Sequence, residues 1–142
     1  MQKNILKVSL CLFLLNCTST KTNTYNQQMK QAFIFDFKIT YFKKLLVEGF
    51  NKTDAIKSIV KQDQSGFGEI ILSQNDYDLL DSLVKIDNEF MRKDSLNRIG
   101  RVAEGAQGKR VLAYALSKYE SKWLDTLAKA RSKIFMKNFK AN

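Results

Sequence analysis

Cys17 carries the clearest chemical signal in the sequence, because the residues before it are typical of a segment that directs acylation of a cysteine thiol. Lys3 and Lys7 make a short positive segment, and the apolar run 8–15 that follows is too short to span a bilayer. Leu14-Leu15-Asn16-Cys17 then fits a lipobox, after which a signal peptidase cuts and Cys17 receives a diacylglyceryl group. We therefore predict a lipoprotein signal peptide over residues 1–16. A plain secretory signal and a buried N-terminal helix are the alternatives.

The residue types that are missing narrow the chemistry further. The sequence has no histidine, and its other cysteine, Cys11, lies in the predicted signal peptide. Histidine is the commonest general base near neutral pH and the commonest metal ligand, so Ser-His-Asp, Cys-His and histidine-based metal sites are excluded. Four aspartates have the spacing of a solvated helix face: Asp76, Asp78, Asp81 and Asp87. The first of them lie in the first turn, where the helix dipole favours acidic side chains. We predict no enzymatic activity, no metal and no cofactor.

The sequence is strongly basic, with a formal net charge of +10 at pH 7. In an exported protein this balance favours an anionic membrane surface, an anionic envelope polymer or an acidic protein as the partner. The lysines near the C-terminus are spread at helical spacings, which equally suits a solvated helical surface: Lys118, Lys122, Lys129, Lys133 and Lys137. We expect no nucleic acid partner.

Composition divides the chain into three parts. The small polar residues of 17–26 are typical of a flexible tether, and residues 27–142 are long enough to form one domain with its own core. Proline is absent, and the 6 glycines are confined to a few junctions. The predicted fold class is all-α, a small antiparallel bundle of about four to five helices.

Apolar spacing predicts the first helices of this bundle. A helix over 27–48 should be central, because it carries two adjacent apolar stripes: Phe33, Phe37, Tyr41 and Leu45 in one, and Phe35, Ile39, Phe42 and Leu46 in the other. Gly49 is expected to end it as the C′ residue. A short helix over 53–62 should turn four residues inward: Ala55, Ile56, Ile59 and Val60. Ser73 and Asp76 predict a capping box at the start of a third helix.

One long helix is expected over residues 109–137. A continuous apolar stripe follows its length: Leu112, Leu116, Tyr119, Trp123, Leu127, Ala130 and Ile134. Four alanines would let a neighbouring helix approach it closely: Ala113, Ala115, Ala128 and Ala130.

The segment 98–108, which precedes this helix, is the first candidate for a binding site. Three of its 11 positions in RIGRVAEGAQG are glycine and two are arginine. It lacks the Gly-Lys-Ser/Thr ending and the preceding strand of a nucleotide-binding loop. A flexible connector and a protruding partner-binding loop both remain open, since glycines and arginines on a braced loop suit insertion into a cleft.

Three groups of residues together resemble the type VI secretion amidase immunity family, a group of small exported helical proteins. They are Thr40-Tyr41-Phe42-Lys43-Lys44-Leu45 with Gly49-Phe50; Asp63-Gln64-Ser65-Gly66-Phe67 with Asp76-Tyr77; and Gly108-Lys109-Arg110-Val111-Leu112 with Leu116-Ser117-Lys118-Tyr119-Glu120-Ser121 and Leu124-Asp125.

The resemblance implies an immunity protein that binds a cognate peptidoglycan amidase of the papain-like type and occludes its active-site cleft. It further implies a homodimer, in which a loop of one subunit enters the cleft. We assign that loop to 98–108, with 63–69 as second choice. The expected partner-binding residues are Arg98, Arg101, Glu104, Gly105, Gln107 and Gly108.

The location expected for such a protein is the cell envelope. A lipid on Cys17 would tether it to the outer membrane facing the periplasm, and without the lipid it would be soluble in the periplasm. The alternative function is that of a non-enzymatic accessory lipoprotein whose basic surface binds anionic lipid or cell-wall polymer.

Overall fold

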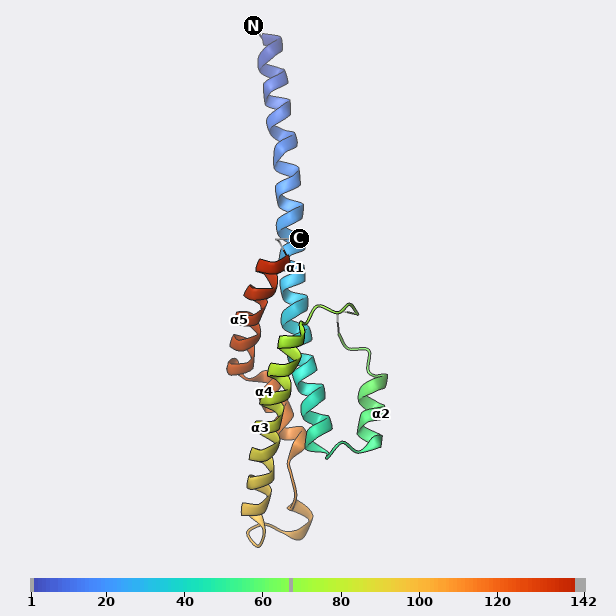
Figure 1. The fold of residues 1–142 in the computed structure, drawn as a ribbon. Coiled ribbons are helices and arrows are strands. Elements are labelled where there is room, and N and C mark those ends of the chain that lie inside the picture. Colours follow the sequence, from blue (N-terminus) through green and yellow to red (C-terminus); the bar gives the residue numbers. More distant parts are fainter. Residues whose placement is uncertain (1, 67, 140–142) are drawn as a thin grey trace.

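The computed structural model describes residues 2–66 and 68–139, with the side chains of 24–66 and 68–139. These residues form five α-helices, one short 3-10 helix and no strand, which confirms the predicted all-α bundle (Figure 1). The elements are α1 (Gln2–Gly49), α2 (Asp54–Gln62), α3 (Gln74–Arg98), η1 (Glu104–Ala106), α4 (Val111–Glu120) and α5 (Lys122–Phe139). α1 and α3 run one way along the bundle, while α2, α4 and α5 run back (Figure 1).

The predicted signal peptide 1–16 and Cys17 lie outside the described side chains. The structure describes only the backbone of α1 before residue 24, so residues 17–23 of the predicted tether 17–26 also lie outside the described side chains. The signal peptide, the tether and the lipid on Cys17 therefore stay predictions. Within the described part of the chain, no helix has an apolar stretch long enough to cross a membrane.

α1 is the central helix, as the sequence predicts. Its first stripe is fully buried, with exposed fractions of 0–1% at Phe33, Phe37, Tyr41 and Leu45. The second stripe is only half-buried, and Phe35 is 44% exposed. α3, α4 and α5 all pack on α1, and their buried residues meet its first stripe in one core.

The end of α1 differs from the prediction. Asn51, not Gly49, is the left-handed C′ residue, with φ of 57°. The amide of Lys52 donates to the Val47 carbonyl at 2.8 Å and that of Asn51 to the Glu48 carbonyl at 3.0 Å, which is the Schellman pair. Gly49 is needed for a different reason: a Cβ there would lie 2.5 Å from Cγ1 of Val111. The glycine therefore sets how closely α4 approaches α1.

α3 begins as predicted. Ser73 accepts a hydrogen bond from the Asp76 amide at 3.3 Å, and the Asp76 carboxylate accepts from the Ser73 amide at 2.9 Å. This reciprocal capping box satisfies two amides that the first turn leaves without helical partners.

The last predicted helix is in fact two. Ser121 has extended backbone, with φ of −66° and ψ of 139°, and it separates α4 from α5. Its hydroxyl accepts a hydrogen bond from the Leu124 amide at 3.2 Å, so it serves as an N-cap for α5. Because serine side chains can bond the backbone locally, they favour such caps over helix interiors.

The predicted stripe on these two helices is wrong for most of its members, although Leu127 does pack against the core. The buried face lies about one residue to the side, and three of its five residues are small: Val111, Ala115, Leu124, Ala128 and Ser132. Four large members of the predicted stripe are 47–57% exposed: Leu112, Leu116, Trp123 and Ile134. Small residues occupy much of the buried face because they let α4 and α5 approach α1 closely.

α2 also departs from the prediction, because none of its residues is buried. Ile59, which was expected to face inward, is 63% exposed. α2 packs mainly on α1 and stands to the side of the bundle (Figure 1). Lys43 fastens the chain that follows: its ammonium lies 2.8 Å from the Asp63 carboxylate and donates to the Ser65 carbonyl at 2.8 Å. The bonds from Lys43 and Ser65 lower the pKa of the Asp63 carboxyl.

We predict that Gly49→Ala destabilises the protein, because the new methyl group overlaps a side chain of α4. Overpacking of this kind costs about 1–3 kcal/mol in free energy of unfolding. Urea denaturation followed by circular dichroism measures it.

Two comparisons make the Gly49 test specific. Gly105→Ala should leave stability unchanged, because nothing lies within 4 Å of a Cβ there. The loss from Gly49→Ala should shrink when Val111 is also replaced by alanine. If the two substitutions prove additive, the close approach at Gly49 does not limit packing.

Candidate functional site

The predicted binding loop lies at the end of the bundle opposite the N-terminus, between α3 and α4 (Figure 1). Its exposed side chains include Arg101, Glu104 and Gln107, and η1 makes a single tight turn at its tip. The structure thus brings the expected contact residues other than Arg98 together on one exposed loop. Open space surrounds Gly105, so another chain can approach its backbone closely.

Arg98 has a different position from the other expected contact residues. Its side chain is 13% exposed and turns into the loop. The guanidinium is paired with Asp94 at 3.0 Å, and it also donates to the carbonyls of Ala106 (3.0 Å) and Gly108. Charge-assisted bonds of this kind hold the second half of the loop against the end of α3. Arg98 therefore positions the loop.

Two glycines allow the loop to turn. Gly100 follows α3 with φ of 75°, and Gly108 precedes α4 with φ of 95°. Other residues adopt this left-handed region at a cost, so both positions favour glycine. The loop therefore has a defined backbone path at each end.

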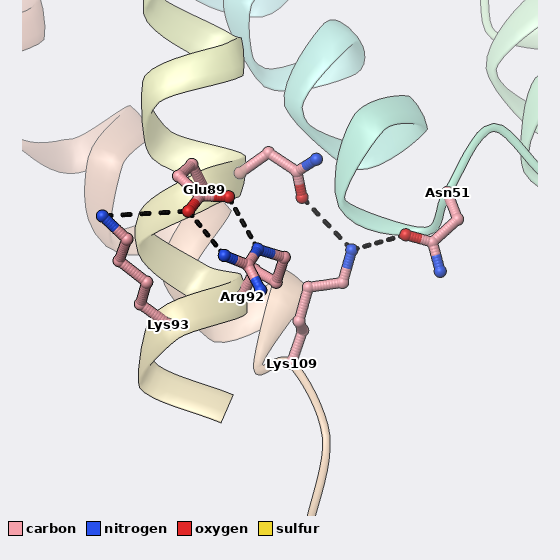
Figure 2. Close-up of polar contacts among 6 residues, drawn as sticks. Asn51, Glu89, Arg92, Lys93 and Lys109 are labelled. Carbon is pink, nitrogen blue, oxygen red and sulfur yellow. Dashed lines mark hydrogen bonds and ion pairs between the residues drawn. The ribbon is translucent and has the colours of Figure 1, made fainter. Parts of the chain in front are cut away.

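Lys109 anchors the base of the loop to the rest of the bundle. Figure 2 shows its ammonium reaching the side chain of Asn51, just after α1, at 2.7 Å, and the Asn88 oxygen of α3 lies at 3.2 Å. Partial burial lowers the pKa of the Lys109 ammonium. Both amide oxygens accept from the ammonium, so it is hydrogen-bonded at the meeting point of α1, α3 and the loop.

The charged side chains of α3 next to this anchor pair with one another at the surface. Arg92 lies 2.7 Å from Glu89, and Lys93 approaches the same carboxylate at 3.8 Å (Figure 2). The hydrogen bond from Arg92 lowers the pKa of Glu89. These side chains are about half exposed, and such surface pairs contribute little to stability.

The four aspartates do not form the solvated face that the sequence predicts. Asp78 and Asp81 are exposed, but Asp76 and Asp87 are buried, with exposed fractions of 4% and 6%. Asp76 pairs with Arg131 of α5 at 2.7 Å. It also lines a groove of about 290 Å³ between the start of α3 and the end of α5.

Asp87 is a buried carboxylate with three partners from two other helices. It accepts hydrogen bonds from the hydroxyl of Tyr41 on α1 and from that of Tyr114 on α4 at 2.6 Å. The ammonium of Lys118 lies 2.8 Å away. Burial raises the pKa of Tyr41 and of Tyr114, and the hydrogen bond to Asp87 is the second cause of the increase. Sequence reasoning missed this cluster, although Asp87 occupies a helical position among apolar residues.

We predict that Asp87→Asn lowers the free energy of unfolding by about 2–4 kcal/mol, since it removes the negative charge that pairs with Lys118 and one acceptor of a buried tyrosine. Asp81→Asn is the matched control on the same helix. Its carboxylate is 50% exposed, so the loss there should stay below about 1 kcal/mol. Equal losses in the two variants would contradict the role given to Asp87.

We also predict a loss of stability at high pH. The folded protein holds the protons of Tyr41 and Tyr114 more tightly than the unfolded chain, whose tyrosines ionise at about pH 10. Their contribution is therefore complete below about pH 10 and is lost as the pH rises further. In an alkaline titration, part of the tyrosinate absorbance should appear only together with the loss of helical circular dichroism. That delayed part should shrink in Tyr114→Phe.

Two further findings bear on function. Among the described residues, no group of three histidine, cysteine or acidic side chains is placed to hold a metal ion. Comparison with protein-family models, with curated proteins and with solved structures finds no match to this chain.

Proposed function

We propose that this protein is an immunity protein that binds a cognate peptidoglycan amidase effector of a type VI secretion system and inhibits it by placing the loop 98–108 in its active-site cleft. The observation that supports this proposal is the combination of an exposed loop tip with a firmly bonded loop base. Loops held by a rigid scaffold are frequent binding elements.

The bonds at the loop base favour tight binding. Arg98 ties residues 106 and 108 to the end of α3, and Lys109 ties the chain to α1 and α3. A loop that is ordered before it meets its partner loses less conformational entropy on binding. Arg98 therefore acts by holding the loop in shape, and the exposed residues make the contacts.

The loop tip offers both charges and close backbone approach. Arg101 and Glu104 present opposite charges, and Gln107 adds an amide that can donate and accept hydrogen bonds. At Gly105 the backbone is bare, which suits a narrow cleft. Occlusion of a cleft needs no reactive group in the inhibitor, which agrees with a chain that has no histidine.

A second candidate function is that of an accessory envelope lipoprotein, tethered through Cys17, whose basic surface binds anionic lipid or polymer. The excess of lysine and arginine over acidic residues, 24 against 14, supports it. The two functions differ in their partner. Immunity requires a tight complex with a small Cys/His hydrolase encoded next to this chain, whereas the accessory role requires weaker, salt-sensitive binding to the envelope.

We predict that the charge swap Arg101→Glu with Glu104→Arg weakens inhibition of the neighbouring amidase by about thirtyfold or more, the effect of losing a central interface contact. Inhibition of peptidoglycan cleavage and calorimetric titration measure it. The matched control is Asp54→Lys with Lys57→Glu on α2, an exposed pair of opposite charges at the same sequence spacing.

The control swap keeps the net charge and should leave inhibition unchanged. If the swap at Arg101 and Glu104 has no effect either, the loop is not the inhibitory element. If no complex with the amidase forms at all, the immunity function itself is wrong.

A further inference from the structure

The outer face of α5 carries an apolar stripe that folding leaves exposed. Trp123 is 47% and Ile134 is 50% exposed, and Ala130 is exposed between them. Their spacings of seven and four residues place them on one side of the helix. Trp123, Leu127 and Ala130 line a shallow, mainly apolar groove there. Exposed apolar surface of this kind indicates a binding site.

Basic residues border this stripe. α5 contains four lysines and one arginine but a single acidic residue, Asp125. Lys133 and Lys137 are exposed and lie beside Ala130 and Ile134 at helical spacing. Asp125 is already paired with Lys129 at 2.6 Å. The surface beside the stripe therefore attracts an anionic partner.

We propose that the outer face of α5 is a docking surface for an anionic phospholipid bilayer. A helix lies in a bilayer interface when an apolar stripe with tryptophan enters the headgroup boundary and lysines flank it. Lysine methylene stems can lie along the apolar region while their ammonium groups reach the lipid phosphates. A straight, shallow stripe suits a flat interface.

Trp123 marks the N-terminal end of this surface. It is the only tryptophan of the chain, its ring is edge-on to Tyr41 with centroids 6.5 Å apart, and the Lys118 ammonium lies 5.0 Å from its centroid. These contacts fix the ring in place with the rest of its surface open to solvent. Its fluorescence therefore reports directly on the outer face of α5.

The docking surface is separate from the loop 98–108. α5 lies toward the N-terminal end of the bundle, and the loop lies at the opposite end (Figure 1). The inference does not rest on amidase binding, so either proposal can fail while the other holds.

The test is a titration of the full chain with vesicles, followed by Trp123 fluorescence. Vesicles of phosphatidylglycerol and phosphatidylcholine should shift the emission to shorter wavelength, and lipids brominated on their acyl chains should quench it. Pure phosphatidylcholine should do neither. Because the readout belongs to Trp123, insertion of the apolar residues 8–15 would not imitate it.

A matched pair of variants locates the contact. Lys133→Gln with Lys137→Gln should weaken the anionic-vesicle response about thirtyfold, since each lysine at such a surface contributes a factor of about five. Lys57→Gln with Lys61→Gln removes the same charge from the exposed face of α2 and should leave the response within about threefold. Unchanged Trp123 emission with anionic vesicles, equal quenching in phosphatidylcholine, or equal losses in both variants would overturn the proposal.

Discussion

The buried carboxylate of Asp87 is the interaction on which the arrangement of three helices depends. α3 and α4 each pack on α1, and Asp87 joins all three through two tyrosine hydroxyls and the Lys118 ammonium. A buried carboxylate is tolerated only when its lone pairs are occupied by donors of good geometry. Apolar contacts alone would permit neighbouring helices to shift along one another. We infer that Asp87 fixes their register.

This register carries through to the loop end of the bundle. Asn88 follows Asp87 directly and accepts from Lys109, which also binds Asn51 just after α1. Arg98 lies about three turns further along α3 and holds the loop carbonyls. The position of the loop is therefore linked through a chain of polar contacts to the helices that form the core.

Sequence reasoning predicted the features that depend on local pattern. The buried stripe of α1 and the capping box at Ser73 follow from spacing and from local hydrogen bonding, and both are confirmed. What it missed depends on packing across helices. Asp87 looked like a surface acid until Tyr41 and Tyr114 were brought against it, although its place at an apolar position of α3 was a usable signal. The break between α4 and α5 was missed because a single serine, Ser121, is its only signal in the sequence.

The expected contact residues other than Arg98 do lie on one exposed segment, but the sequence could not separate the position of Arg98 from theirs. Arg98 and Arg101 are the same residue type three positions apart, and only the structure shows that the first turns into the loop. Whether a loop is firmly held depends on contacts with distant residues such as Asn51, which no local pattern encodes.

The choice of small residues at the core face of α4 and α5 explains why a second apolar face remains. Ala115, Ala128 and Ser132 are fully buried, so both helices lie close to α1 and the core is closed without Leu116, Trp123 or Ile134. Stability does not require large apolar side chains at those exposed positions, where polar residues would serve solubility better. The stability of the fold therefore does not explain why large apolar residues occupy this exposed stripe. The lysines beside it are the reason for proposing an anionic bilayer as its partner.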